Sequence, residues 1–303
     1  VDHITLTWVR IPLNEPFRIS NGVVAEKDGI VVAVHSDGLT GYGESSPMAG
    51  SFYSADTPES CWQQLVESLV PQTAGRSFES LADACQWLDA VPGSNFAKVG
   101  IETALWDLEA QRRGLPLHEL LGEQANEKPA AAAQSGLAVG LYPTTADLCR
   151  TIERYVPDGY KRVKIKISRG HDLELVQAVR NAFGDTPLMT DANADYTLDY
   201  QPVFEQLDQF GLLMFEQPLG GAMLEDSAKL QSALKTPICL DESLETLKDV
   251  QRAIELKSFR IGNIKIQRVG GFWNALEVYR TLRSAGLSIW VGTMPELGIG
   301  QAQ

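Results

Sequence analysis

Five ionisable residues recur along this chain at an almost constant interval. They are Lys166, Asp191, Glu216, Asp241 and Lys265, and the successive gaps are 25, 25, 25 and 24 positions. Each of them ends a short apolar run of the kind that forms a buried strand, and the interval has room for one strand, one helix and their loops. The spacing therefore predicts five parallel strands that present base, acid, acid, acid and base around one ring.

The alternation of strands and helices extends over the chain from about residue 130 onward. Helical patterns, such as residues 173–183 and 272–285, separate the strand-like segments. Strands that alternate with helices of this length form a parallel sheet, and the near-constant repeat favours a (β/α)8-type TIM barrel over an open sheet. We expect the eighth strand of this barrel and its helix to be missing from the sequence. The expected strands are residues 133–139, 162–167, 187–191, 212–216, 237–241, 260–265 and 287–292.

The first 125 residues follow a different pattern, in which strands come first and helices after. Residues 4–9 alternate as a strand does, and two further strands, 29–35 and 39–44, flank an Asp-Gly turn that favours a hairpin. Segregated strands and helices are typical of a small α+β module. We therefore expect an α+β domain over residues 1–125 and a barrel domain over 126–303. The expected helices of the first domain are residues 57–70, 77–88 and 95–112.

Composition excludes two classes of partner. Lys and Arg total 26 against 39 Asp and Glu, and the formal charge of −13 would repel nucleic acid. No stretch approaches the roughly 20 apolar residues that span a bilayer, so we expect no membrane insertion. The four cysteines form no CxxC pair, and no signal peptide is visible, which favours a cytoplasmic protein. We expect a homo-oligomer that acts on a small-molecule carboxylate.

The three periodic acids predict a metal site. The C-terminal ends of barrel strands meet at one mouth, so Asp191, Glu216 and Asp241 would crowd together there. Their repulsion and desolvation would be costly unless a cation neutralised them. Oxygen ligands without Cys or His favour a hard ion, with Mg²⁺ as the first choice and Mn²⁺ or Ca²⁺ as alternatives. Each acid taken alone could be a helix cap or a surface residue, but the shared spacing argues for one joint site.

The lysines predict proton transfer beside this site. Lys164 and Lys166 lie two positions apart on one expected strand, so their side chains share a face. Like charge and partial desolvation would lower the pKa of one of them toward that of a useful base. Lys265 comes from the opposite side of the ring and could reach the other face of the same substrate carbon.

Some further residues have weaker signals. Asn193 and Glu242 follow two of the expected ligands closely and could orient a ligand or a lysine. The pair Gly270-Gly271 could bring a helix N-terminus near an anionic ligand group, or could be a plain turn into a helix.

Several short motifs resemble the enolase superfamily, specifically its muconate-lactonizing-enzyme subgroup. The resemblance spans the whole chain, because the first 125 residues are similar to the capping domain of that family. Other motifs are most similar to o-succinylbenzoate synthases and N-acylamino-acid racemases: Glu-Gln-Pro-Leu, Thr-Pro-Ile-Cys-Leu-Asp-Glu-Ser, Arg-Val-Gly-Gly and Glu-Leu-Gly-Ile-Gly. The subgroup motifs are Lys-Ile-Lys at 164–166, Asp-Ala-Asn at 191–193, Glu-Gln-Pro at 216–218, Asp-Glu-Ser at 241–243 and Asn-Ile-Lys at 263–265.

The resemblance implies a role for each of the five periodic residues. The three acids would hold Mg²⁺, Lys166 would take the proton next to a substrate carboxylate, and Lys265 would stabilise the ene-diolate intermediate or act as the second acid/base. Such a proton is too weakly acidic for a lysine until a metal and a second cation stabilise the negative charge.

The resemblance also implies mobile lid loops over the substrate, at residues 17–22 and 51–53. Arg18 and Tyr53 could touch a substrate carboxylate or aryl group, or could simply pack their loops. Glu296 ends the segment Thr-Met-Pro-Glu, which borders the expected pocket, and is a third candidate for substrate binding.

These observations predict a Mg²⁺-dependent enzyme that abstracts a proton α to a carboxylate. Syn-dehydration to o-succinylbenzoate is the first interpretation. The same residues could racemise N-acylamino acids, epimerise dipeptides or act as a muconate cycloisomerase. An alternative from another class is an aldolase in which Lys265 forms a Schiff base, and a further one is a non-catalytic metal-binding barrel.

Overall fold

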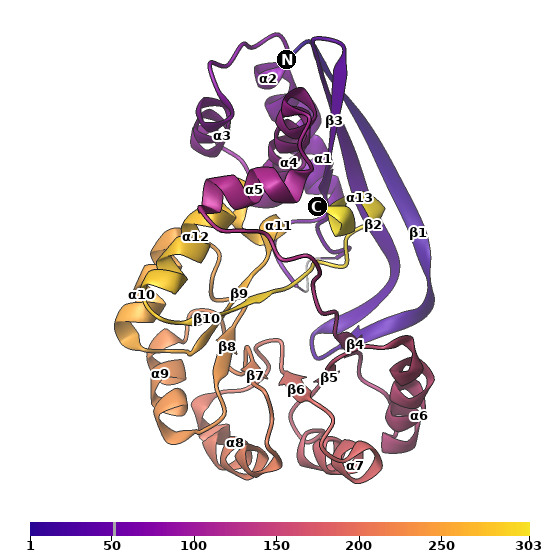
Figure 1. Ribbon diagram of the computed structural model, residues 1–303. Helices are drawn as coiled ribbons and strands as arrows, with labels where there is room; N and C mark the ends of the chain where they lie inside the picture. The colour runs from indigo at the N-terminus through magenta and orange to yellow at the C-terminus, as the bar shows by residue number, and fades with distance from the viewer. Residues whose placement is uncertain (51–52) are drawn as a thin grey trace.

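The computed structural model describes residues 1–50 and 53–303, and its strands form two separate sheets (Figure 1). The first sheet is antiparallel, in the order β1-β2-β3. It consists of β1 (His3–Ile19), β2 (Gly22–Ser36) and β3 (Leu39–Ser45). The long β1–β2 hairpin runs down one side of the molecule and ends near β4 and β5 (Figure 1).

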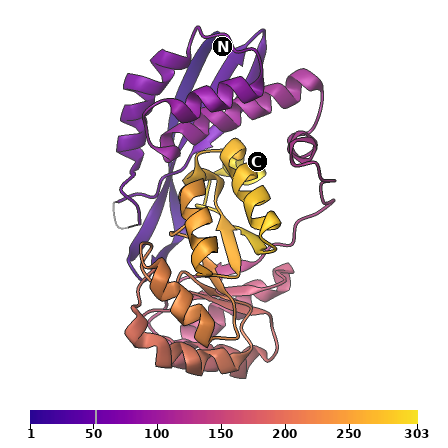
Figure 2. The ribbon, with the colours of Figure 1, turned by 90° about the vertical axis from the view of Figure 1, so that its left-hand side faces the viewer.

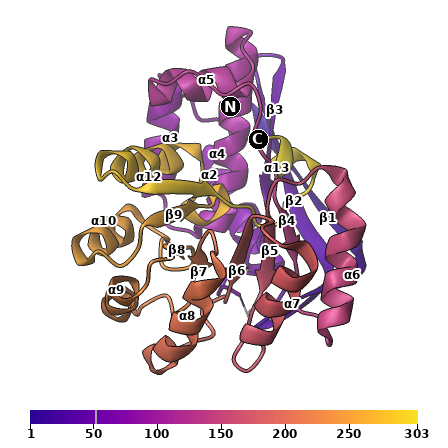
Figure 3. The same ribbon diagram turned by 60° about the horizontal axis from the view of Figure 1, so that its bottom comes forward.

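The second sheet contains seven parallel strands in the order β10-β9-β8-β7-β6-β5-β4. Figure 3 shows that the strands curve around a common centre, as in a partial barrel. Within the described residues the two edge strands, β4 and β10, do not pair with each other. All seven predicted strands are present: β4 (Leu137–Val139), β5 (Val163–Lys166), β6 (Leu188–Asp191), β7 (Phe215–Glu216), β8 (Ile238–Leu240), β9 (Ile261–Ile264) and β10 (Ser288–Val291).

Helices cover the outer face of this sheet (Figure 3). The main hydrophobic core lies between the two layers and includes Ile165, Phe215 and Ile238 from the strands and Phe204 and Val250 from the helices. The covering helices are α6 (Thr145–Tyr155), α7 (Leu173–Phe183), α8 (Gln201–Leu207), α9 (Leu224–Ala233), α10 (Leu247–Leu256) and α12 (Phe272–Ser284). Short turns complete the region: η2 (Val156–Asp158), η3 (Leu198–Tyr200), η4 (Asp208–Phe210), α11 (Ile266–Val269) and α13 (Gly298–Ala302).

The remaining helices pack on the antiparallel sheet. Helix α4 lies so close to β3 that a Cβ atom on Gly41 would come within 2.1 Å of the Ala104 carbonyl oxygen, and one on Gly43 within 2.1 Å of the Gly100 carbonyl oxygen. Figure 2 shows these N-terminal helices, in purple, above the orange and yellow helices of the parallel sheet. They are α1 (Pro58–Gln64), the π-helical turn η1 (Leu65–Leu69), α2 (Val70–Thr73), α3 (Leu81–Ala90), α4 (Asn95–Arg113) and α5 (Leu117–Ala125).

Two elements differ from the sequence-based expectation. Strand β1 does not end near Val9 but continues to Ile19, through a register irregularity between Pro12 and Phe17. Segment 17–22 is therefore the closed end of a hairpin rather than an open loop. Helix α5 is not among the helices expected from the sequence. Gly114 ends α4 in the left-handed conformation, and α5 begins directly after Pro116. No described helix is long and apolar enough to cross a membrane.

Candidate active site

The charged side chains of the parallel sheet meet on its concave side. Lys166 pairs in register with Asp191, and Asp191 with Glu216, so these three residues lie at one level of neighbouring strands. Asp191, Glu216 and Asp241 are almost completely buried. An apolar cluster built from residues two positions earlier on these strands and from β9 supports the charged side chains: Met189, Met214, Cys239 and Ile261. Cys239 is thus a small core residue.

Lys166 and Lys164 occupy one side of the charged cluster. Lys166 Nζ lies 2.6 Å from Asp191 Oδ2 and 2.6 Å from Asn193 Oδ1. Lys164 Nζ lies 3.0 Å from Asp191 Oδ2 and 3.0 Å from both carboxylate oxygens of Glu216. Burial alone would lower the pKa of Lys164, but the charges of Glu216 and Asp191 outweigh it and hold that pKa well above its usual value. The expected lowering is therefore not seen at Lys164, because carboxylates surround its ammonium group.

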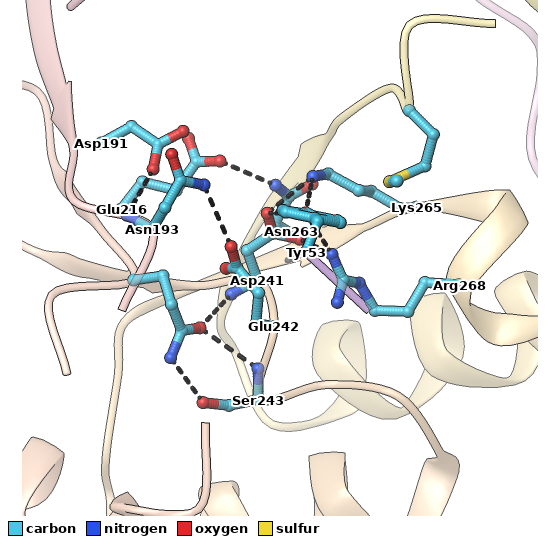
Figure 4. A network of polar contacts seen from close by, with 12 residues as sticks. Tyr53, Asp191, Asn193, Glu216, Asp241, Glu242, Ser243, Asn263, Lys265 and Arg268 are labelled. Carbon is cyan, nitrogen blue, oxygen red and sulfur yellow. Dashed lines mark hydrogen bonds and ion pairs between the residues drawn. The ribbon is translucent and has the colours of Figure 1, made fainter. Parts of the chain in front are cut away.

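Lys265 occupies the other side, in contact with Asp241. Its Nζ lies 2.7 Å from Asp241 Oδ2 and 2.9 Å from the Tyr53 hydroxyl (Figure 4). Arg268 Nη2 donates to the same hydroxyl at 2.5 Å and lies 3.2 Å from Asp241 Oδ1. Sequence reasoning did not single out Arg268. Two signals for it were present: it begins the motif Arg-Val-Gly-Gly, and it lies three residues, or one helical turn, after Lys265.

The cations set the charge state of the two aspartates. Burial alone would raise the pKa of Asp191, but the charges of Lys166 and Lys164 and the hydrogen bond from Lys166 together outweigh it, so that pKa lies below its usual value. Burial likewise acts to raise the pKa of Asp241, but Arg268 and Lys265 together outweigh it and lower that pKa. Both carboxyl groups are therefore held in the ionised form, which is the form that binds cations.

The two glutamates of the cluster behave in the opposite way. Burial, with the neighbouring charge of Asp191, raises the pKa of Glu216. Burial, with the charge of Asp241, raises the pKa of Glu242 to about 7. The Asn193 amide donates to Glu242 Oε1 at 3.0 Å, so the two residues predicted to orient the site contact each other directly (Figure 4).

Backbone conformation fixes the loops that follow β6 and β7. Asn193, Ala194 and Gln217 have positive φ values of 44°, 63° and 35°, which are uncommon for residues other than glycine. The Gln217 side chain accepts from the backbone N–H of Asp241 at 2.8 Å and donates to Ser243 Oγ at 2.7 Å. Gln217 therefore holds the loop that carries Asp241, a role that sequence reasoning also missed.

The donor set fits a hard divalent cation. The cluster offers three carboxylates. Among the described residues, two buried carboxylate oxygens of the site, Asp241 Oδ1 and Glu242 Oε2, accept no hydrogen bond, and the first has only the ion-pair contact with Arg268 Nη2 at 3.2 Å. Oxygen donors of this kind suit Mg²⁺ or Mn²⁺. In the part of the chain that the structure describes, the carboxylates point to the cations around them, and no three His, Cys, Asp or Glu side chains converge closely enough to form a ligand set.

The three residues suggested for substrate binding lie in different surroundings. Tyr53 belongs to the Lys265 side, as described above, whereas residues 51 and 52 lie outside the described residues. Arg18 is exposed near the end of the hairpin. Glu296 accepts from Met294 N at 2.9 Å and from Gln301 Nε2 at 3.0 Å, within its own segment. Among the described residues, neither Arg18 nor Glu296 hydrogen-bonds to the charged cluster.

The end of the β1–β2 hairpin contacts the loop after β6. Ser20 Oγ donates to the Ala192 carbonyl at 3.1 Å, and Asn21 Nδ2 donates to the Asn193 carbonyl at 3.0 Å. A largely apolar cavity of about 550 Å³ lies between this hairpin, β4 and the segment after β10. One lining residue, Ala138, pairs in register with Lys164, so the cavity adjoins the charged cluster. Other lining residues are Phe17, Val24, Met48, Met294 and Leu297.

Comparisons with known proteins agree with this arrangement. Residues 3–122 match the N-terminal domain of the mandelate racemase and muconate lactonizing enzymes, and residues 147–303 match the enolase C-terminal domain-like family. An o-succinylbenzoate synthase from Geobacillus kaustophilus is 41% identical over 303 residues, which are 100% of this chain and 80% of that protein. An N-succinylamino acid racemase from Thermus thermophilus is 35% identical over 302 residues, with the same coverage.

A solved structure has the same fold. The dipeptide epimerase from Cytophaga hutchinsonii, complexed with Mg and the dipeptide D-Ala-L-Val, superposes with a TM-score of 0.89 at 26% identity. The match covers 96% of this chain and 79% of that one. The fold, the family matches and the relatives agree along the length of the chain. The chain therefore belongs to the enolase superfamily, among the relatives of mandelate racemase and muconate lactonizing enzyme, and is an enzyme of that superfamily.

Proposed function

We propose that this enzyme abstracts a proton next to a substrate carboxylate and, as its main activity, forms o-succinylbenzoate by syn-dehydration. The observation that carries the proposal is the pair of buried lysines, Lys166 and Lys265. They come from β5 and from the residue after β9, and each is paired with an aspartate of one charged cluster. The 41% identity to an o-succinylbenzoate synthase over the whole chain supports dehydration as the outcome.

The proposed roles follow from these positions. Asp191, Glu216 and Asp241 would hold Mg²⁺ or Mn²⁺, and the bound cation would stabilise negative charge that develops on the substrate carboxylate. Lys166 would accept the proton. Lys265 would stand at the opposite face, where it stabilises charge or acts as the second acid/base. Asn193 and Glu242 would orient Lys166, because Asn193 accepts from Lys166 and donates to Glu242.

Charge balance favours a substrate with two carboxylates. Four basic and four acidic side chains meet in the cluster, so it is close to neutral. A divalent cation added to it would leave two positive charges, which a doubly anionic substrate would offset. The product o-succinylbenzoate carries two carboxylates, and so does its precursor because loss of water leaves them unchanged; N-succinylamino acids also carry two, whereas simple dipeptides do not. The eight side chains are Lys164, Lys166, Lys265, Arg268, Asp191, Glu216, Asp241 and Glu242.

We further propose that residues 1–125 form a capping domain and residues 126–303 the catalytic barrel domain. The 550 Å³ cavity between them would receive the apolar part of the substrate, with Glu296 at its wall. Tyr53 would close the Lys265 side. Arg18 would meet a substrate carboxylate at the hairpin end only if its exposed side chain turned inward.

Racemisation of N-succinylamino acids is the second candidate function. Two lysines on opposite sides of one carbon suffice for it, and the Thermus thermophilus relative supports it. An aldolase is disfavoured by a specific contact. Burial would lower the pKa of Lys265, but Asp241 together with Tyr53 and Glu242 outweighs it and raises that pKa, so the amine is protonated and a poor nucleophile for an imine.

The test is incubation of the enzyme with Mg²⁺ in D₂O. One sample contains the synthase substrate, and the other contains both enantiomers of an N-succinylamino acid. Dehydration without deuterium at the amino-acid α-carbon supports the synthase, whereas α-deuteration without dehydration replaces it by the racemase. Activity that survives EDTA, together with borohydride trapping of a carbonyl compound at Lys265, would contradict both.

A further inference from the structure

The segment that carries Lys265 and Arg268 is held from behind by helix α4. On one side of this segment, the two cations point to Asp241. On the other side, Asn95 Nδ2, at the start of α4, donates to the Arg268 carbonyl at 2.9 Å. Two helical turns later on α4, Glu102 accepts from the backbone N–H groups of the residues that begin α12.

Glu102 is the anion at the N-terminus of α12. Its Oε2 accepts from Phe272 N at 2.9 Å, and its Oε1 accepts from Trp273 N at 2.9 Å and from Trp106 Nε1 at 2.7 Å. The side chain is almost completely buried. A carboxylate at this place satisfies helix amides that would otherwise be unpaired and interacts favourably with the helix dipole.

The glycine pair before α12 makes room for this carboxylate. A Cβ atom on Gly271 would lie 2.2 Å from Glu102 Oε2, and Gly271 has a φ of 133°. A Cβ atom on Gly270 would lie 2.9 Å from Asn95 Oδ1. The sequence left open whether this pair faces an anionic ligand group or is a plain turn into a helix; in the structure the helix N-terminus that follows it meets the carboxylate of Glu102.

We propose that Glu102 is a positioning residue for Lys265, an inference that rests on the proposed function. Only the single turn of α11 (Ile266–Val269) separates Lys265 from the glycine pair. A displacement of the α12 N-terminus would therefore pass along the chain to Lys265 and Arg268. Lys166 lies on β5 and has no contact with Glu102 among the described residues, so the loss of the carboxylate would affect one face of the substrate and spare the other.

The variant that tests this is Glu102→Gln in the whole enzyme. Glutamine has the same size, but it lacks the charge and presents an N–H₂ group to one of the two backbone N–H donors. The first measurement is amide hydrogen–deuterium exchange by mass spectrometry. We expect faster exchange in the peptide that spans 266–273 and unchanged exchange in the peptide that spans 163–167.

The second measurement is the rate of α-proton exchange of each enantiomer of an N-succinylamino acid. Lys166→Ala and Lys265→Ala show which lysine serves which enantiomer. Since small displacements of a catalytic group cost large factors in rate, we expect Glu102→Gln to lose about tenfold at the Lys265 face and less than about twofold at the Lys166 face. If the enzyme dehydrates without such exchange, kcat for dehydration should fall about tenfold while KM stays within about twofold.

Matched variants guard against general damage. Glu109→Gln makes the same change on the same helix at a carboxylate that pairs with Arg112 at the surface, and it should leave both faces unchanged. Gly271→Ala should reproduce the one-sided loss, and the double variant should be no slower than the slower single variant, because both changes act on one contact. Should Glu102→Gln not fold, Asn95→Ala removes only the bond to the Arg268 carbonyl and should give a loss of about threefold at the same face.

Three results for Glu102→Gln would overturn the proposal. They are an equal loss of the α-proton exchange rate at both faces, an unchanged kcat for dehydration, and unchanged amide exchange in the peptide that spans 266–273. A wild-type enzyme that neither dehydrates nor exchanges would instead overturn the proposed function, so the two failures can be told apart.

Discussion

The two sides of the charged cluster are supported in different ways. The loop beside Lys166 is held by the hairpin end, through neutral hydrogen bonds from Ser20 and Asn21 to two backbone carbonyls. The segment that carries Lys265 is held by Glu102, a buried carboxylate at a helix N-terminus. A neutral hydrogen bond contributes about 1 kcal/mol, whereas removing one partner of a buried charge costs about 3–5 kcal/mol. The Lys166 side can therefore detach from its support far more easily than the Lys265 side.

The backbone shows the same contrast. After β6, the chain reverses through Asn193 and Ala194, which adopt positive φ values at a cost of roughly 1–2 kcal/mol each. After α11, the chain reverses through Gly270 and Gly271, which adopt such values with little strain. The strained turn carries the side chain that bonds to Lys166, so its conformation depends on the contacts around it. The glycine turn carries little strain of this kind.

The largest effect should come from the lysines themselves. Lys166→Ala and Lys265→Ala should each lower turnover by about a thousandfold or more, because each removes a proton-transfer or charge-stabilising group. Metal retention should be unchanged. The measurements are turnover of both candidate substrates and retained Mn²⁺ after dialysis. Full activity in either variant would contradict the view that each side of the site carries one essential lysine.

Removal of a carboxylate should affect both sides at once. Asp191→Asn, Glu216→Gln or Asp241→Asn should weaken Mn²⁺ binding by roughly tenfold or more, because each removes an ionised oxygen ligand. Titration followed by electron paramagnetic resonance measures this. Asp195→Asn is the matched control, since Asp195 pairs with Arg169 outside the cluster. Equal metal affinity in all four variants would contradict the ligand assignment.

The buried carboxylate should make the two supports differ in their response to pH. Burial raises the pKa of Glu102 to about 7 from 4.5. The native state therefore binds this proton more tightly than the unfolded state, and the cost of burying the ionised group is present in full above about pH 7 and absent below about pH 4.5. Relative to Glu102→Gln, the wild type should gain about 2 kcal/mol in free energy of unfolding from about pH 8 to about pH 5.

Denaturant unfolding at several pH values measures this difference. Asn21→Ala removes a neutral hydrogen bond and serves as the comparison, since its cost should be the same at every pH. If the difference in free energy of unfolding between wild type and Glu102→Gln does not vary with pH, the carboxyl group titrates in the same range in the folded and the unfolded chain.

The smallest effect should come from the hairpin end. Asn21→Ala removes one hydrogen bond to the Asn193 carbonyl and should slow exchange at the Lys166 face by about threefold. The Lys265 face should be unaffected, which is the reverse of the result expected for Glu102→Gln. The enantiomer-resolved exchange assay measures both. A loss at the Lys265 face instead would show that the hairpin does not act through the loop after β6.

Much of this fold could be predicted from the sequence, for reasons visible in particular segments. Five of the barrel strands, β5 to β9, end in or directly before a charged residue, and Leu173–Phe183 repeats its apolar positions with helical period, so both give local signals. The extension of β1 to Ile19 gave no such signal. Pro12 and Pro16 indicate the end of a strand, and only the pairing with β2 shows that β1 continues past them.

The candidate site was predictable only in part, for a similar reason. The residues at strand ends share one period, and the structure brings Lys166, Asp191, Glu216, Asp241 and Lys265 into one cluster. Arg268 and Gln217 lie outside that period, and their partners are distant in sequence. The raised pKa of Lys164 likewise depends on which carboxylates surround it. The spacing shows which types of side chain meet at the strand ends. It does not show which side chains of different repeats contact one another.

The contact of Glu102 also bears on how the molecule assembles. The carboxylate comes from the N-terminal part of the chain, whereas Phe272 and Trp273, whose amides neutralise it, come from a helix about 170 residues later. Before that helix is in place, Glu102 lacks two of its hydrogen-bond donors, and the amides of Phe272 and Trp273 lack their acceptor. Part of the stability of the N-terminal part therefore depends on contacts that form only when the remainder of the chain has folded against it. We expect the two parts to unfold together as one cooperative unit.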